Sequence, residues 1–282
     1  MKIAVVGKGG SGKSSIAWLL SMHASQKKNV LAIDADYNMD LATNLQWNPA
    51  MPTKYLNHAE GDFYAYQGLS ELDYYVDLPE KNLKEFSLSP PDQFTKKYAH
   101  SLSHQLSLMV FGGLHEDLLY GHRCSHAYIS ALKYYLPLLK IKENEVVVVD
   151  SVAGIDMVGY GLYLGVDALI IVTEPTENSK KVAAQIKVIA DEFGIPSIQI
   201  RNKEQKSEEI SFSLDEGIQT CDYRKISAAN KSTATRLLDS IQRTTRDAHW
   251  QRHKRWKEKY DIQKERNKVR PFMFNKILEK GI

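Results

Sequence analysis

Six uninterrupted apolar segments constrain the fold of this chain more than any other feature of its sequence. Continuous apolar runs, rather than alternating ones, indicate strands covered on both faces, as in parallel sheets. Amphipathic helical patterns lie between several of them, at residues 14–26 and 178–193. Strands that alternate with helices predict an α/β fold: a doubly wound, mostly parallel sheet with helices on both faces and ligand-binding loops at the carboxyl ends of its strands. The segments span residues 3–7, 30–34, 106–112, 146–150, 168–173 and 198–200.

Two regions depart from this alternation. Residues 48–104 hold six of the fifteen tyrosines and show weak periodicity, which predicts an insertion between the second and third core strands. After residue 223 the chain becomes basic and helical in composition. We therefore divide the 282 residues into an α/β domain at 1–223, with an insertion at about 48–104, and a basic helical C-terminal extension at 224–282.

The net charge of +3 conceals an uneven distribution. Residues 224–280 carry 17 Lys and Arg against 6 Asp and Glu, a balance of +11, so the remainder carries 20 against 28, or −8. A basic tail on an acidic body predicts an anionic partner for the tail, and a solvated helix face explains the same charges equally well.

Neither a membrane span nor a secretion signal is expected. No apolar run approaches the ~20 residues that a span requires, and Lys13 interrupts any signal-peptide core that follows the start. Cys124 and Cys221 lie far apart and give no disulfide framework. These features predict a cytoplasmic protein.

The segment GKGGSGKSS at residues 7–15 fits two phosphate-binding patterns. Its glycines make the G-x-G-x-x-G of dinucleotide sites, and they also make the G-x-x-x-x-G-K-[ST] of the P-loop. Only the P-loop gives a role to Lys13, which reaches the β- and γ-phosphates, and to Ser14, whose hydroxyl ligates Mg²⁺. A dinucleotide site, with Asp34 or Asp36 as its ribose-binding acid, is the alternative.

A P-loop predicts ATP or ADP and Mg²⁺ as ligands. Successive backbone N–H groups wrap the phosphates with help from the following helix dipole. Glycines are needed where the backbone meets phosphate, because side chains would clash there. The residues expected to bind phosphate are Gly9, Gly10, Ser11, Gly12, Lys13, Ser14 and Ser15.

A second element of such a site is a hydrophobic strand ending in an acid. VVVVD at residues 146–150 supplies it, with Asp150 as the Walker B carboxylate in the Mg²⁺ shell. The loop that follows contains Gly154, whose N–H is placed to sense the γ-phosphate.

Lys8 has no role inside its own loop, because Lys13 already serves that side of the phosphates. Across a two-fold interface it would reach the phosphates of a second copy. The loop Lys8-Gly-Gly-Ser-Gly-Lys-Ser14 resembles the K-G-G-x-G-K-[ST] of the deviant Walker A ATPases, the MinD/ParA and nitrogenase iron protein group. Residues 34–40 (DADYNMD) and 150–156 (DSVAGID) are similar to the switch I and switch II segments of that group.

The resemblance covers about residues 1–46 and 105–203, and it implies further roles. Lys8 acts in trans, Asp36 orients the attacking water, and Asp40 joins Asp150 in supporting hydrated Mg²⁺. Asn202 corresponds to an asparagine that hydrogen-bonds adenine, although a lone Asn after a strand is also a common loop residue.

The resemblance also implies a cycle. ATP joins two subunits, hydrolysis separates them, and the protein acts as a switch that another molecule reads. A scaffold that binds ATP without hydrolysing it is the non-enzymatic alternative, and the presence of all three switch aspartates argues against it.

Among possible outputs, maturation of a metal centre is favoured. The motifs look most like those of the nickel-insertion ATPases that serve carbon monoxide dehydrogenase, the CooC type. Those proteins bind metal between subunits with a C-x-C pair, where this chain has Cys124 and His126. Doubled by symmetry, the two residues would give a four-ligand S₂N₂ site for Ni²⁺ or Zn²⁺, and an ordinary buried cysteine is the alternative.

Maturation would require a client protein, which the sequence does not identify. Two positioning roles are the alternatives to maturation. In the ParA manner, the basic extension would bind DNA through cations interleaved with Trp250 and Trp256. An amphipathic helix that packs its tryptophans on the body is the alternative. In the MinD manner, Phe274, Ile277 and Leu278 would lie on an anionic membrane. The cations considered are Arg243, Arg246, Arg252, Lys254, Arg255 and Lys257.

Overall fold

The computed structural model describes residues 1–48, 54–70, 82–112, 130–203 and 210–269. Its centre is an eight-stranded sheet in the order β10-β9-β8-β1-β7-β2-β5-β4. Every neighbouring pair is parallel except the antiparallel β4 and β5. The predicted mostly parallel sheet is therefore confirmed. The strands are β1 (Lys2–Gly7), β2 (Asn29–Ala35), β4 (His100–Ser103), β5 (Leu106–Val110), β7 (Glu145–Ser151), β8 (Ala168–Thr173), β9 (Ser197–Asn202) and β10 (Ser211–Phe212).

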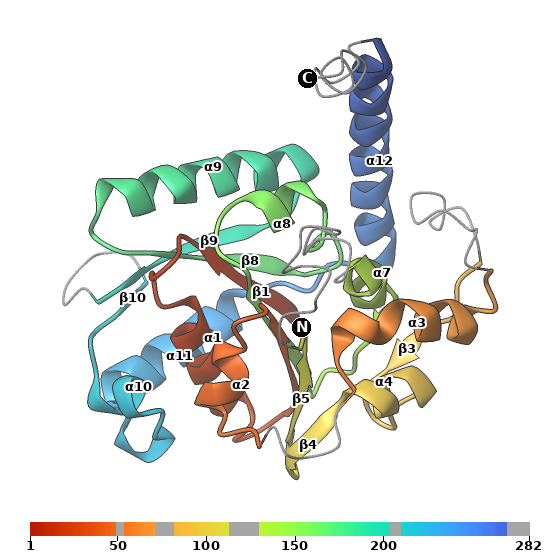
Figure 1. Cartoon of the computed structure of the whole chain (residues 1–282). Helices are drawn as coiled ribbons and strands as arrows, with labels where there is room; N and C mark the ends of the chain where they lie inside the picture. The colour runs from red at the N-terminus through yellow and green to blue at the C-terminus, as the bar shows by residue number, and fades with distance from the viewer. Residues whose placement is uncertain (49–53, 71–81, 113–129, 204–209, 270–282) are drawn as a thin grey trace, which may run out of the picture.

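Helices cover both faces of the sheet (Figure 1). Each face has its own apolar core, because successive strand residues point to opposite sides, so Ile3 and Val5 lie in one core and Ala4 and Val6 in the other. One face carries α1 (Lys13–Ala24), α2 (Asp40–Asn44), α10 (Glu216–Thr220) and α11 (Ala228–Ser240). The other carries α3 (Ala59–Gln67), α4 (Gln93–Tyr98), α7 (Ser130–Leu138), α8 (Asp156–Gly159), α9 (Glu177–Phe193) and part of α12 (Arg246–Val269).

The tyrosine-rich region packs on the sheet as a small aromatic layer. Phe63, Phe86 and Phe94 stand with ring centroids 5.1 to 6.2 Å apart, and Tyr135 of α7 closes the group. A two-stranded parallel sheet, β3 (Phe86–Ser87) with β6 (Leu139–Lys140), ties this layer to the chain after α7. Residues 100–103, expected within the insertion, form the edge strand β4 of the main sheet.

The extension shares the cores of the body instead of standing apart. Leu237 of α11 is buried in the same core as Leu20 of α1. On α12, Trp256 is buried in the opposite core, and the last turns of the helix project beyond the body in Figure 1. The helical character predicted for the extension is confirmed as far as residue 269, whereas the domain boundary at 223 stays a prediction.

Candidate functional site

The glycine-rich loop joins the carboxyl end of β1 to the start of α1. Both glycines that flank it sit where a side chain has no room. A Cβ at Gly7 would lie 2.5 Å from the Val172 carbonyl oxygen of β8, and one at Gly12 would lie 2.2 Å from Asn202 Nδ2. Gly12 also has a φ of +88°, which L-residues rarely adopt. The loop is therefore held close to the neighbouring strands by its glycines.

A cleft of about 490 Å³ opens over this loop. It contains most of the residues that the sequence assigned to nucleotide and Mg²⁺: Gly9, Gly10, Gly12, Lys13, Ser14, Ser15, Asp36, Asp40 and Asn202. Its other wall comes from Lys203 and from residues 213–221, with Ser213, Leu214, Ile218, Gln219 and Cys221. These residues carried no phosphate or base motif in the sequence; they come from the ends of β9 and β10 and from α10 and its flanks, and only the fold brings them here.

Lys13 occupies the floor of this cleft. Its Nζ donates to the Lys8 carbonyl oxygen at 3.3 Å, and the side chain is buried. Burial lowers the pKa of Lys13, while the carboxylates of Asp150, Asp36 and Asp40 act in the opposite direction. The loop thus holds the buried ammonium group of Lys13 among carboxylates. A phosphate bound by the loop would lie against the same ammonium group.

Asp34 and Asp150 lie side by side below the loop, because β2 and β7 are neighbours and pair these two residues in register. Burial raises the pKa of Asp34 to about 7, although its carboxylate accepts hydrogen bonds from the N–H groups of Ala42 and Asp36. Burial and the charge of Asp34 raise the pKa of Asp150 well above its usual range. Burial likewise raises the pKa of Asp36. Such a cluster holds protons or a cation far better than it tolerates free negative charge.

Asp150 does not line the cleft itself, yet it is the clearest sign of what the site accepts. Its side chain is fully buried, yet neither carboxylate oxygen makes a hydrogen bond with any residue that the structure describes. The hydroxyl of Ser14 lies close enough to lower the pKa of Asp150 but outside hydrogen-bond geometry. The Ser11 hydroxyl is likewise buried and unbonded within the described chain. Buried acceptors of this kind beside a serine hydroxyl fit the shell of a hydrated Mg²⁺ ion.

Asn202 and Gly154 are both engaged with the loop itself. Asn202 Nδ2 donates to the Ser11 carbonyl at 2.9 Å, and its Oδ1 accepts from the Lys203 N–H at 3.1 Å. The Gly154 N–H donates to the Gly7 carbonyl at 3.0 Å. In this structure Asn202 therefore positions the loop, and contact with adenine or phosphate would require these two groups to exchange partners.

Lys8 lies at the rim, where its Nζ donates to the adjacent Gly9 carbonyl at 3.2 Å. Lys203, which the sequence did not single out, reaches the same loop from β9. Its Nζ pairs with Glu174 and lies 3.4 Å from the Gly10 carbonyl. Two lysines therefore flank the loop, and Lys8 is the one with no carboxylate partner among the described residues.

The transition-metal candidates Cys124 and His126 lie outside the described residues. Within the described residues, no group of three or more His, Cys, Asp or Glu side chains could hold a metal ion. Cys221 is a free, half-buried cysteine on the wall of the cleft.

The extension uses three of its predicted phosphate-binding cations internally. Arg243 donates to the carbonyls of Lys142 and Glu143, and Arg246 pairs with Glu85. Arg252 is 4% exposed and donates through Nη1 to the carbonyls of Leu164 and Val166, so it faces the body and not a nucleic acid. Trp256 packs on the body, as the amphipathic interpretation predicts. Phe274, Ile277 and Leu278 lie outside the described residues, and none of the helices found within those residues has the length and apolarity to cross a membrane.

Curated relatives match this chain over most of its length. The chain is 33% identical over 225 residues to the carbon monoxide dehydrogenase accessory protein CooC of Rhodospirillum rubrum, covering 76% of this chain and 79% of the relative. It is 32% identical over 204 residues to an uncharacterised ATP-binding protein of Methanocaldococcus jannaschii, covering 72% and 78%. No protein-family model matches the chain.

Solved structures agree on the fold. The Mg-ADP complex of the septum site-determining protein MinD from Pyrococcus horikoshii has a TM-score of 0.52 at 16% identity, covering 92% of this chain and 95% of that one. The ATP complex of a variant of McdA from Cyanothece has a TM-score of 0.56 at 14% identity, covering 86% and 98%. The sequence relatives select the P-loop over the dinucleotide alternative. The chain belongs to the family of P-loop ATP-binding proteins that includes CooC, and it is built on the MinD/ParA fold.

Proposed function

We propose that the protein is a Mg-ATP-dependent, dimerising ATPase that acts as a molecular switch in the maturation of a metalloenzyme. The observation that carries the ATPase proposal is the buried, unbonded carboxylate of Asp150 beside Lys13 and Ser14, directly below the glycine loop. The kinship with CooC, an accessory protein of carbon monoxide dehydrogenase, supports the maturation role.

Each residue of the cleft has a chemical task in this proposal. The N–H groups of residues 9–15 and the ammonium of Lys13 bind the phosphates, and the Ser14 hydroxyl and the carboxylates of Asp40 and Asp150 surround the magnesium ion. When bound, Mg²⁺ neutralises phosphate charge. Asp36, half-buried with a raised pKa, is placed to orient the attacking water and to accept its proton.

Lys8 completes the site from a second copy of the chain. Its single hydrogen bond goes to a neutral carbonyl at the rim, so the ammonium is available to a phosphate of the facing subunit. Stabilisation of transition-state charge by such a residue in trans accounts for about 10³-fold or more in turnover. Loss of the γ-phosphate removes the attraction and opens the dimer, which makes the subunit arrangement report the nucleotide state.

The test is Lys8→Ala, with Lys27→Ala in the exposed turn after α1 as the matched control. We expect Lys8→Ala to bind ATP as wild type does by calorimetry, to stay monomeric in light scattering with a non-hydrolysable ATP analogue, and to lose turnover by at least about 10³-fold. The control keeps both activities. Normal dimerisation and hydrolysis by Lys8→Ala would refute the trans role.

The maturation role is tested at the metal. We propose that Cys124 and His126 from two subunits bind Ni²⁺ or Zn²⁺, as the resemblance in sequence implies. Equilibrium dialysis of wild type, Cys124→Ala and the control Cys221→Ala measures it. We expect one metal ion per dimer, lost only in Cys124→Ala. Equal uptake by all three would end the metal proposal while leaving the ATPase proposal intact.

Positioning on DNA is the second candidate, favoured by the exposed Lys254 and Arg255 of α12. ATP-dependent retention on DNA that weakens steeply with salt would support it. Retention that is independent of ATP would argue against it. Flotation with anionic liposomes, with and without residues 271–282, tests the membrane version in the same way.

A further inference from the structure

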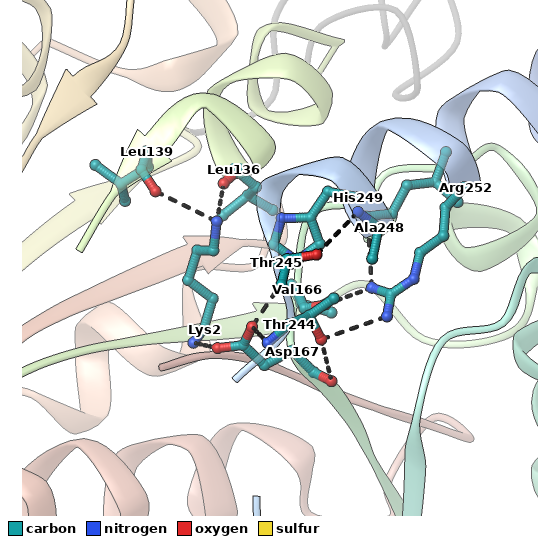
Figure 2. A network of polar contacts seen from close by, with 11 residues as sticks. Lys2, Leu136, Leu139, Val166, Asp167, Thr244, Thr245, Ala248, His249 and Arg252 are labelled. Atoms are coloured by element: carbon teal, nitrogen blue, oxygen red, sulfur yellow. Dashed lines mark hydrogen bonds and ion pairs between the residues drawn. The ribbon is translucent and has the colours of Figure 1, made fainter. Parts of the chain in front are cut away.

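A second cleft lies at the opposite end of the sheet from the glycine loop. It encloses about 260 Å³ and lies beside Lys2, the first residue of β1, whereas the loop follows Gly7, the last. Residues of β1, of the chain around β6 and of the start of α12 line it, and Figure 2 shows several of them. We call it the far cleft. Its charged and imidazole residues are Lys2, Glu85, Lys140, Asp167, Arg243, Arg246 and His249.

Positive charge exceeds negative charge in the far cleft. Four Lys and Arg side chains face two carboxylates, a formal excess of two. Glu85 is engaged by Arg246 and lies 3.6 Å from the Nζ of Lys140. Asp167 accepts the N–H groups of Lys2 at 2.7 Å and Thr244 at 2.8 Å. Both carboxylates therefore already have partners within the chain, and the four cations exceed them by two positive charges.

Lys2 and Arg243 both donate to backbone carbonyls beside the cleft. Lys2 is 4% exposed, and its Nζ donates to the carbonyl oxygens of Leu136 and Leu139 (Figure 2), which uses two of its three protons. Arg243 donates through Nη2 to the carbonyls of Lys142 and Glu143. Because carbonyls are neutral, these bonds balance neither charge; the nearby Asp167 carboxylate offsets that of Lys2 in part. Burial lowers the pKa of Lys2 to about 8.

His249 adds an unbonded polar wall. The side chain is 2% exposed, and neither ring nitrogen meets hydrogen-bond geometry with the described residues, although the Val166 backbone lies close enough to raise the pKa of the ring against burial. The Asp167 carboxylate lies 3.8 Å from Nε2, outside hydrogen-bond reach. Burial lowers the pKa of His249 to about 2, so the ring is neutral and offers one N–H donor. A buried donor left without a partner is unfavourable, and a bound acceptor would relieve it.

We propose that the far cleft binds a small, doubly charged oxyanion of the phosphate class between Lys2, Arg243 and Arg246, with His249 donating from the buried wall. The cleft volume corresponds to roughly nine waters at ~30 Å³ each, which suits a free ion with a few waters and not a nucleotide. The ion would join the start of β1 to the start of α12 and so strengthen the attachment of the extension to the body.

The test must keep the glycine loop out of the measurement. Equilibrium dialysis with radiolabelled inorganic phosphate is therefore done on the full chain with the loop saturated by Mg-ADP. We expect one phosphate per chain, and at least a tenfold loss of affinity in the double variant Arg243→Gln, Arg246→Gln. Arg224→Gln, an exposed arginine paired with Asp222, is the matched control and keeps wild-type uptake.

Thermal unfolding supplies a second measurement. Phosphate, compared with chloride at equal ionic strength, is expected to raise the Tm of wild type and of Arg224→Gln but not of the double variant. If the double variant does not fold, the single variant Arg243→Gln replaces it with the same expectation. Uptake that is absent in wild type, or equal in wild type and variants, would overturn the proposal. Equal binding of the monoanion dimethyl phosphate would overturn the choice of a dianion.

Discussion

Asp150 closes β7 at the carboxyl end of the central sheet, and Asp167 precedes β8 at the amino end. Both side chains are at most 1% exposed. Asp150 has no hydrogen bond to the described residues, and its carboxylate neighbour Asp34 raises its pKa further. Asp167 binds two backbone N–H groups, one from β1 and one from the segment that leads into α12 (Figure 2).

This difference indicates two roles: Asp150 is available to a ligand, whereas Asp167 links two segments of the chain. An unbonded buried carboxylate destabilises the free protein, and it persists where a ligand later supplies the missing charge. A carboxylate with two backbone donors is satisfied without a ligand, and it fixes the start of the extension to the sheet. Substitutions that keep the shape and remove the charge should therefore act in opposite ways at the two ends.

The largest effect is expected for Asp150→Asn. Turnover of Mg-ATP should fall by about 10²–10³-fold, because the substitution removes charge from the magnesium shell. The free protein should unfold in urea at the same denaturant concentration as wild type or at a higher one, since no hydrogen bond is lost. A clear loss of stability in the ligand-free variant would show that Asp150 bonds within the chain, and the contrast with Asp167 would fail.

Asp167→Asn is expected to reduce the free energy of unfolding by about 3 kcal/mol. The new amide places its own N–H₂ against one of the two backbone donors and leaves Lys2 and Arg252 without a compensating charge. Urea unfolding measures this loss. Asp191→Asn, an exposed change on α9, is the control and should stay within about 0.5 kcal/mol of wild type. A loss no larger than the control's would mean that Asp167 does not anchor the extension.

The carboxyl end of the sheet could be predicted from the sequence. Continuous apolar runs revealed the parallel strands, and the loop at residues 7–15 required a phosphate ligand, because both are local signals. Asp34 and Asp150 become neighbours through strand order, which the sequence motifs did not predict. The relatives confirm the family, whereas the roles of single residues stay predictions.

The amino end could not be predicted in the same way. Arg252 lies among other charged residues, and Lys2 is a charged residue at the start of an apolar run; nothing local shows that either one is buried. Their burial depends on how α12 returns to the sheet, which is a contact between residues far apart in the sequence. The edge strand β4 was missed for a related reason, since four residues of mixed polarity gain strand structure only by pairing with β5. Trp250 and Trp256, on either side of Arg252, were the local signs that this face of the helix packs inward.

A pH titration of the free protein sharpens the comparison further. The pKa of Asp34 is about 7 in the folded chain and near 3.8 when exposed, so the folded state holds this proton more tightly than the unfolded state does. Between about pH 4 and pH 7, Asp34 should therefore lower the free energy of unfolding by about 3 kcal/mol, whereas His249, whose pKa burial lowers to about 2, acts in the opposite direction. The contribution of Asp34 is isolated as the difference in unfolding free energy between wild type and Asp34→Asn, measured by urea unfolding across the range. A difference that does not decrease as the pH rises would contradict the buried acid cluster.

The smallest effect is expected where the chain after α8 contacts α12. This contact lies between the nucleotide end of the sheet and the extension. The Trp256 indole N–H donates to the Gly159 carbonyl at 2.9 Å, and Lys133 donates to the Tyr160 carbonyl at 3.2 Å. Gly161 has a φ of +82°, and a Cβ there would lie 2.9 Å from the Trp256 ring.

Gly161→Ala should therefore cost about 1–2 kcal/mol of stability, because it adds backbone strain and displaces the indole. Gly159→Ala is a matched control two residues away, in α8, where a Cβ meets nothing within 4 Å. It should be neutral or slightly stabilising. Urea unfolding followed by tryptophan fluorescence reports both. Since residues 150–156 precede this contact directly, a Gly161→Ala variant that also shifts the ATP concentration needed for dimerisation would show that the nucleotide end and the extension are coupled through Trp256. Equal stability of the two alanine variants would show instead that α12 tolerates displacement of Trp256, and that this contact does not couple the nucleotide end to the extension.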